Sequence, residues 1–120
     1  MKYRFDKQLR IKKRDDLDRV FSRGQRINDR YLTVFAVQNG LTFSRGGVAV
    51  SKRHGGAVRR NRLKRLCREA IRHVLPDLPE GWDVMVIPRA GRNLRAERLE
   101  ESLRRLSGRV TQQDANRSES

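Results

Sequence analysis

Residues 57–74 read AVRRNRLKRLCREAIRHV, and this stretch decides the fold expected for the chain. Its apolar residues recur at the three- and four-residue spacing of an α-helix, which places them on one face. They are Leu63, Leu66, Cys67, Ala70, Ile71 and Val74. The rest of the circumference carries Arg62, Lys64, Arg65, Arg68 and Arg72. The pattern predicts a helix that packs one face against a core and presents the other to a negatively charged partner.

The composition also indicates a polyanionic partner, and the length indicates one domain. The 120 residues carry 29 Lys and Arg against 14 Asp and Glu, a formal net charge of +15. Nucleic acid is favoured over a membrane surface because the basic residues lie on helices with ordinary core-facing stripes, not beside a bulky aromatic insertion face. No apolar run reaches the roughly 20 residues of a membrane span, and the start, MKYRFDKQLR, lacks the apolar stretch of a secretion signal. The sequence predicts a cytoplasmic protein that binds no membrane.

Cys67 is the only cysteine. A single cysteine excludes an internal disulfide and a cysteine-cluster zinc site. Because it lies on the apolar stripe of the predicted helix, we interpret it as a small buried hydrophobic residue.

The segments upstream of the central helix are assigned from their local patterns. Residues 1–12 are basic without a clear period and are interpreted as an arm. Residues 15–23 have the spacing of a short helix, and Gly24 is a candidate left-handed cap at its end. The β-branched and aromatic residues of 31–37 predict a strand, and residues 47–52 predict a second, central strand.

The segments downstream are assigned in the same way. Residues 76–81 read PDLPEG and should end the central helix, and residues 82–88 predict another strand. Asn93 is a candidate cap for a final helix that ends before Gly108. The apolar stripe of that helix is Leu99, Leu103 and Leu106. Residues 109–120 are polar and are expected to form a disordered tail.

Together these assignments predict an α+β fold over residues 13–108. If residues 41–44 form a short additional strand, the order is α-β-β-β-α-β-α. The expected architecture is a small two-layer sandwich with helices packed on a mostly antiparallel sheet.

The run Val58-Arg59-Arg60-Asn61-Arg62-Leu63-Lys64-Arg65, followed by Arg68 and Glu69, resembles the RNR signature of the bacterial ribonuclease P protein subunit. The similarity continues on both sides of the signature. Val20-Phe21 with Gly24 resembles the first helix of that family, and residues 30–37 resemble its first long strand. Residues 48–53 and 82–89 resemble the strands on either side of the signature helix. The similarity extends over roughly residues 10–108.

This resemblance implies a subunit of an endoribonuclease that removes the 5′ leader from precursor tRNA. The family's large RNA performs the hydrolysis with bound Mg²⁺, so the resemblance implies no catalytic protein side chain. The partners implied are the ribonuclease P RNA and precursor tRNA, and no obligate protein partner is inferred. The family fold also implies a left-handed crossover at the signature helix. The residues expected to contact the RNA subunit are Arg59, Arg60, Asn61, Arg62, Lys64, Arg65 and Arg68.

The resemblance further implies a cleft that holds the single-stranded leader. Stacking bases need aromatic or apolar platforms, with basic residues beside them for the phosphates. The residues expected there are Leu17, Phe21, Tyr31, Phe35, Lys52 and Arg53. From spacing alone, Phe21 and Phe35 are equally compatible with the core. Leu17 stands where family members often carry an aromatic residue, and Gly56 where asparagine commonly precedes the signature helix. The sequence assigns no metal ligand within the protein itself.

Two other functions are compatible with parts of the sequence. A stand-alone nuclease would need several carboxylates converging on metal ions, but the acidic residues are scattered along the predicted helices. His54 lies in a turn beside glycines and is interpreted as an RNA contact or a spacer rather than a general base. A general RNA-binding or ribosomal protein without a processing role is the alternative that composition alone favours.

Overall fold

The computed structural model describes residues 7–91 and 94–119. Three helices and four strands follow one another as predicted, in the order α-β-β-β-α-β-α, which confirms the α+β fold class. The strands are β1 (Gln25–Asn28), β2 (Leu32–Gln38), β3 (Arg45–Val48) and β4 (Trp82–Pro88). The α-helices are α1 (Arg14–Arg23), α2 (Ala57–Val74) and α3 (Ala96–Glu119), and the 3₁₀ helices are η1 (Lys7–Leu9), η2 (Lys52–His54) and η3 (Leu75–Asp77).

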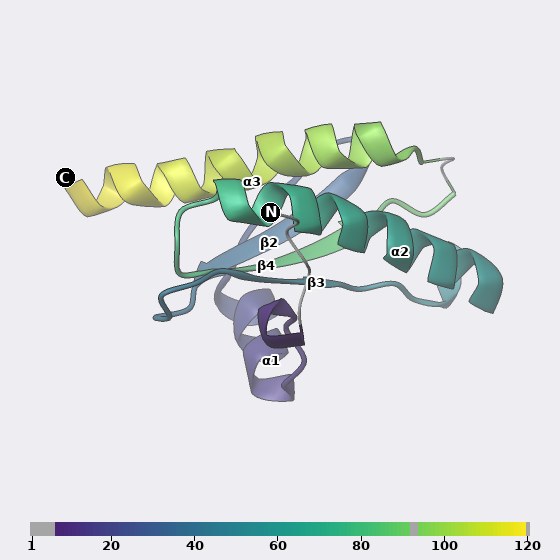
Figure 1. The fold of residues 1–120 in the computed structure, drawn as a ribbon, viewed down its shortest axis with the longest axis horizontal. Helices are drawn as coiled ribbons and strands as arrows, with labels where there is room; N and C mark the ends of the chain where they lie inside the picture. Colours follow the sequence, from purple (N-terminus) through teal and green to yellow (C-terminus); the bar gives the residue numbers. More distant parts are fainter. Residues whose placement is uncertain (1–6, 92–93, 120) are drawn as a thin grey trace.

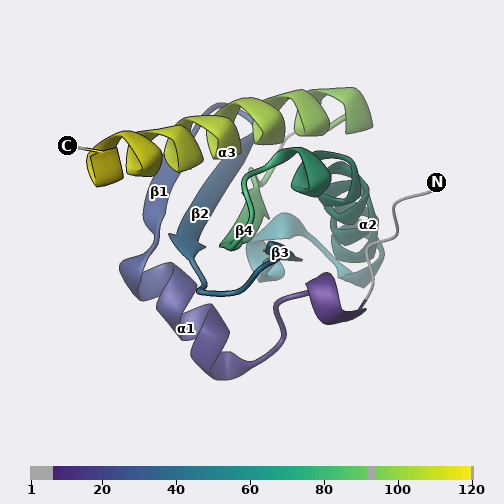
Figure 2. The ribbon, with the colours of Figure 1, turned by 60° about the vertical axis from the view of Figure 1, so that its left-hand side comes forward.

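The sheet has helices on both faces. Helices α2 and α3 lie together over one face, and α1 packs against the opposite one (Figures 1 and 2). The prediction of helices packed on a sheet is correct, but the sandwich has three layers and not two, because α1 covers the face opposite α2 and α3. The main core lies under α2 and α3 and includes Leu32, Val34 and Val84 of the sheet. A smaller cluster under α1 contains Ile11, Val20 and Met85.

The strand order is β1-β2-β4-β3. Strand β2 pairs antiparallel with β1 and with β4, whereas β3 pairs parallel with β4. The third strand was predicted to be central, but it lies beside β4 alone among the named strands. The parallel pairing follows from the connection, because α2 crosses over the sheet between β3 and β4. The hand of this crossover stays a prediction from the family resemblance.

Three local assignments were wrong. Strand β1 was missed, because QRIN is short and polar and gives little strand signal. Residues 41–44 form turns and no strand, so β1 takes the third strand's place in the predicted order. Part of the expected arm is packed into the fold: Ile11 is buried, and its amide donates to the Gly46 carbonyl at 3.0 Å. Residues 1–6 of the expected arm lie outside the described part of the chain.

Helix α2 has the predicted limits, 57–74, and buries the predicted stripe apart from half-buried Leu66. Cys67 is 1% exposed, and burial raises the pKa of its thiol to about 12. A thiol with this pKa is not a nucleophile at neutral pH, so its interpretation as a packing residue is confirmed.

The final helix is longer than predicted. Helix α3 continues through Gly108 to Glu119, and Val110 and Thr111 are buried. The expected disordered tail from residue 109 is therefore wrong, because residues beyond Gly108 continue the helix and its apolar stripe. Asn93, the predicted cap, lies outside the described residues.

The end of α1 also differs from its prediction. Gly24 has φ −69° and ψ 149°, an extended conformation, so it is not a left-handed cap. A Cβ atom at Gly24 would lie 2.2 Å from the carbonyl oxygen of Val20. Glycine is required here because the chain turns directly from α1 into β1 with backbone in close approach.

Candidate nucleic-acid interface

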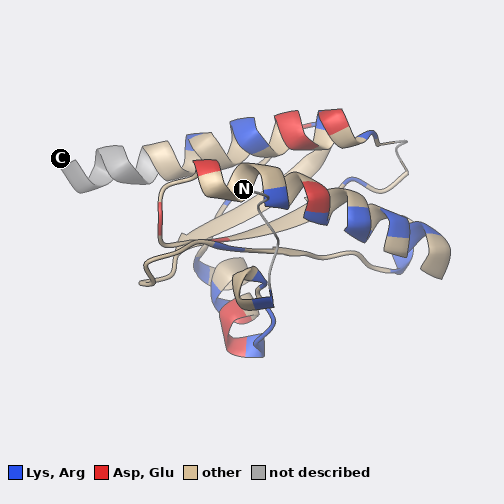
Figure 3. Ribbon diagram, in the orientation of Figure 1, with Lys and Arg blue, Asp and Glu red and all other residues tan. Residues whose placement is uncertain are grey.

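The exposed face of α2 carries the predicted cationic set. Arg59, Asn61, Arg62, Arg65 and Arg68 are exposed, and Arg60 and Lys64 are half-buried. Basic positions predominate along the first half of α2, whereas α3 carries acidic positions near its start and basic positions further along (Figure 3). Guanidinium groups spaced along one helix can fork onto successive phosphate oxygens. The arrangement is suited to docking on a folded RNA backbone.

Arg60 and Arg72 of α2 differ in the contacts that their guanidinium groups make within the protein. The Nε atom of Arg60 is buried and has no hydrogen-bond partner in the structure, which leaves a donor close to the surface. Arg72, by contrast, forms an ion pair with Glu69 one turn away. The hydrogen bond to Glu69 raises the pKa of Arg72, so part of its charge is already compensated. Arg72 is the weaker candidate for a phosphate contact.

A separate aromatic surface lies across the sheet from α2. Phe21 of α1 is 38% exposed, and Phe35 of β2 is half-buried beside it. Their ring centroids are 5.0 Å apart at an interplanar angle of 72°, an edge-to-face pair. Leu17 packs behind them in the smaller cluster with Val20. The structure thus unites three of the predicted cleft residues into one platform between α1 and β2.

The remaining predicted cleft residues lie elsewhere. Tyr31 packs against the main core under α2 and α3, and it does not join the phenylalanine pair. Strand β2 begins only at Leu32, so the period-two alternation that placed Tyr31 with Phe35 does not extend to it. Lys52 and Arg53 are exposed on η2, which is tied to the Pro88 end of β4. They therefore lie toward one end of the sheet, whereas Phe35 pairs with Met85 at the middle of β4.

His54 has a structural role, and its interpretation as an RNA contact or spacer is wrong. Its side chain is 2% exposed. The Nε2 atom donates to the Pro88 carbonyl at 2.6 Å, and Nδ1 accepts from the Ser51 amide at 3.0 Å. A carbonyl can only accept and an amide can only donate, which identifies the neutral tautomer with the proton on Nε2. His54 fixes η2, and with it Lys52 and Arg53, to the end of the sheet.

Sequence reasoning missed Arg26 because it missed β1. Arg26 is directly opposite Phe35 in the β1–β2 register, and cross-strand partners share one face of the sheet. The residue is exposed. It places a guanidinium group beside the aromatic platform, where the backbone phosphates of a stacked single strand would need a cation. Alternation within the four residues of β1 was too short a signal to find it.

A buried ion network holds α1, and therefore Phe21, on the sheet. Asp83 of β4 is 0% exposed and accepts from Arg19 of α1 at 2.7 Å. Arg45 of β3 donates to both carboxylate oxygens of Asp83, at 2.9 and 2.7 Å, and Asn39 adds a further bond at 2.9 Å. The hydrogen bond to Asp83 raises the pKa of Arg45. These contacts set the orientation of α1 relative to the sheet, and therefore relative to Phe35 of β2.

The acidic residues are engaged in pairs rather than gathered at one point. Glu100 accepts from His73 at 2.9 Å, and this bond lowers the pKa of Glu100. Asp16 lies 3.3 Å from Arg45, and Glu69 pairs with Arg72. Among the described side chains, no group of three His, Cys, Asp or Glu residues is placed to hold a metal ion. In the same part of the chain, no helix is long and apolar enough to cross a membrane.

Comparisons with known proteins point to one family. The family model described as Ribonuclease P matches residues 5–111. A ribonuclease P protein component from Thermotoga petrophila is 39% identical over 85 residues, 71% of this chain and 73% of that protein. One from Brevibacillus brevis is 41% identical over 96 residues, 78% and 76% of the two chains.

Solved structures agree with the sequence comparisons. The ribonuclease P protein from Thermotoga maritima superposes with a TM-score of 0.75 at 33% identity, covering 84% of this chain and 96% of that one. The Staphylococcus aureus ribonuclease P protein superposes with a TM-score of 0.72 at 30% identity, covering 86% and 97%.

Proposed function

This chain belongs to the bacterial ribonuclease P protein family and acts as a subunit of that ribonuclease, and we propose that it divides its work between two surfaces. Helix α2 docks on the RNA subunit. The Phe21–Phe35 platform holds the single-stranded 5′ leader of precursor tRNA. The observation that carries this division is the position of the aromatic pair at the cluster under α1, on the sheet face opposite α2.

The docking surface is supported by charge and geometry. The exposed arginines of α2 lie on successive turns, at the spacing that lets each reach a different phosphate. A backbone contact of this kind depends on salt and is indifferent to sequence. It can therefore hold the protein in one orientation on a folded RNA.

The leader surface is supported by a different chemistry. An edge-to-face phenylalanine pair that is partly exposed offers a ring on which a base can stack, and each stacked base contributes about 1–3 kcal/mol. Arg26 beside Phe35 supplies a cation for the leader backbone. Because every base has a π-face, this surface accepts leaders of different sequence.

The chemistry of cleavage is assigned to the RNA subunit and its Mg²⁺ ions. The pairing of Asp16, Glu69 and Glu100 with arginine side chains supports this assignment, because two-metal hydrolysis needs free carboxylates at one point. The protein then acts by positioning the substrate and by neutralising phosphate charge. Its location with the RNA in the cytoplasm belongs to the same proposal.

A reconstitution assay with a ribonuclease P RNA tests the proposal. The protein alone should leave precursor tRNA intact, and adding it to the RNA should lower the Mg²⁺ concentration needed for cleavage. Cleavage by the protein without RNA would support a nuclease. Absence of any effect on the RNA would leave only a general RNA-binding protein.

Matched variants separate the two surfaces. Arg62→Ala should weaken binding to the RNA subunit and reduce the slope of the logarithm of the binding constant against the logarithm of the salt concentration by about one. Arg98→Ala on α3 removes the same charge and should leave RNA binding unchanged. Phe21→Ala should weaken binding of leader-bearing tRNA by about 1–3 kcal/mol and leave leaderless tRNA unchanged. Phe43 on the β2–β3 loop is equally exposed, at 38%, so Phe43→Ala is its control. Equal losses with leader-bearing and leaderless tRNA would overturn the assignment of the platform.

A further inference from the structure

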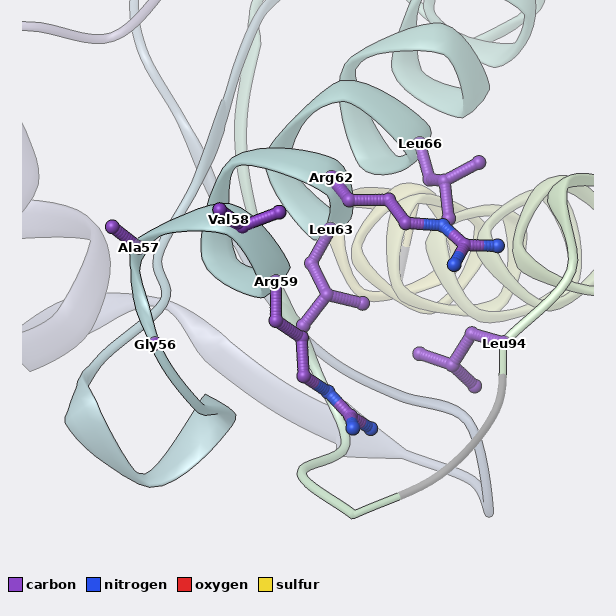
Figure 4. A pocket seen from close by; sticks show the side chains of 8 residues that line it. All are labelled: Gly56, Ala57, Val58, Arg59, Arg62, Leu63, Leu66 and Leu94. Carbon is purple, nitrogen blue, oxygen red and sulfur yellow. The ribbon is translucent and has the colours of Figure 1, made fainter.

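A pocket of about 630 Å³ lies at the start of α2, outside the aromatic platform. Its described lining combines apolar side chains with two arginines: Val58, Arg59, Arg62, Leu63, Leu66 and Leu94, over Gly56 and Ala57. Figure 4 shows Leu94 facing α2 across the opening, with the side chains of Arg59 and Arg62 extending from the helix on its α2 side. This volume falls within the range of small-molecule sites.

The lining selects among possible ligands. It contains no carboxylate, so it offers nothing to a metal cation. A bare phosphate could use the two guanidinium groups but would leave exposed Val58 and half-buried Leu66 without a ligand contact, beside the buried side chains of Leu63 and Leu94. A ligand with a flat apolar part and an attached anion satisfies both halves. An unpaired nucleotide has this chemistry, with its base for the apolar wall and its phosphates for the arginines.

The exposure of Val58 agrees with a ligand at this place. Its side chain is 86% exposed, by far the most exposed of the large apolar residues described. It lies in the first turn of the helix whose arginines face the RNA subunit. At Gly56 a Cβ atom would meet nothing within 4 Å, and the backbone is in an ordinary extended conformation. No contact inside the protein therefore requires glycine at this position, and the space beside Gly56 is open.

We propose that this pocket receives one unstacked base of the RNA subunit, held against Val58, Leu66 and Leu94, while Arg59 and Arg62 contact its flanking phosphates. The inference rests on the proposed docking of α2 and adds a base contact to a surface otherwise described by phosphate contacts alone. A base held in this way fixes the register of α2 along the RNA, which backbone contacts do not.

Two variants of the apolar wall test the proposal. Val58 is exposed and gives the cleaner readout, because half-buried Leu66 also packs against the main core. Val58→Ser and Leu66→Gln keep the charge, and Leu41→Ser on the β2–β3 loop is the control for loss of an exposed apolar residue, since Leu41 is 40% exposed. We expect Val58→Ser and Leu66→Gln to weaken binding to the RNA subunit about 5- to 20-fold with an unchanged salt slope. Leu41→Ser should change binding less than twofold.

Chemical probing of base edges in the reconstituted complex gives the second readout. At least one unpaired RNA base should be protected by the wild-type protein and become reactive with Val58→Ser. Affinity lost without any change in base reactivity would mean that the wall only supports the helix, and it would overturn the proposal. Affinity within twofold of wild type would overturn it as well.

A titration without the RNA subunit keeps this inference distinct from the proposed function. Adenosine 5′-monophosphate should shift the methyl resonances of Val58, Leu66 and Leu94 in the isolated protein, and inorganic phosphate should not. Equal shifts with phosphate would reduce the pocket to an anion site and overturn the inference. If wild-type protein fails to bind the RNA subunit but the nucleotide shifts appear, the docking proposal and the RNA subunit as the source of the base are both overturned, and only a nucleotide-binding pocket remains.

Discussion

Replacing Asp83 should be among the most damaging single changes to the described part of this fold. The Asp83 carboxylate is fully buried and joins α1, β3 and the β2–β3 loop through four hydrogen bonds, from Arg19, Arg45 and Asn39. Asp83→Asn keeps the volume but removes the charge and turns one acceptor into a donor. Breaking a buried ion pair by removing one partner costs about 3–5 kcal/mol.

The surroundings of Asp83 place the expected loss of unfolding free energy at the lower end of that range. The side chains of Arg19 and Arg45 are 29% and 16% exposed, so both can recover part of their hydration. Asp16 also remains 3.3 Å from Arg45 as a second partner. We therefore expect a loss of about 3 kcal/mol, a large part of the roughly 5–15 kcal/mol that stabilises a typical domain. The corresponding fall in Tm is about 10 °C.

Urea unfolding followed by Trp82 fluorescence measures this loss, because Trp82 is buried next to Asp83 in β4. Asp16→Asn is the control: its carboxylate is 22% exposed, and we expect a loss of no more than about 1 kcal/mol. A loss below about 1 kcal/mol for Asp83→Asn, or equal losses for the two variants, would refute the reasoning. At temperatures where Asp83→Asn stays folded, its loosened α1 should weaken leader-bearing tRNA more than leaderless tRNA.

Three further changes test other parts of the structure. Gly108→Ala should stabilise the protein by about 0.5–1 kcal/mol in thermal unfolding, because Gly108 lies inside α3 with nothing within 4 Å of an added Cβ; destabilisation would place the helix end there after all. Gly24→Ala should cost about 2 kcal/mol in the same assay, because its Cβ would lie 2.2 Å from the Val20 carbonyl oxygen. Burial raises the pKa of Asp29, but hydrogen bonds from Ser102 and from the Leu32 and Tyr31 amides outweigh it and lower that pKa below 3.8. The stabilisation by the Asp29 carboxylate is therefore complete above about pH 4 and is lost as the pH falls further. The unfolding free energies of wild type and Asp29→Asn should differ by about 1 kcal/mol at pH 7, and this difference should narrow below pH 4. A difference that stays constant with pH would contradict this.

The local sequence pattern was sufficient to predict a helix or strand wherever a long segment buries one continuous face. Helix α2 and strand β4 have the predicted limits. Eighteen residues at helical spacing indicate α2, and a seven-residue run that is apolar apart from Asp83, between turn signals, indicates β4. The same stretches carry the family signature, so the sequence alone indicated both the fold class and the ribonuclease P family.

Contacts between distant segments were beyond the reach of local pattern. Strand β1 is held by β2 and not by its own four residues, and α3 passes Gly108 because Val110 and Thr111 find a core to enter. Tyr31 packs against the main core, and His54 bonds to the Pro88 carbonyl. Tertiary folding brings these partners together, so local sequence pattern does not reveal them. The sequence by itself determined which residue types lie on the exposed face of α2, through the charge and period of that helix. Only the tertiary structure decided which side chains meet. Phe21 pairs with Phe35, and Arg26 lies opposite Phe35, because of the way in which β1, β2 and α1 pack. That packing is set by burial and by the Asp83 network.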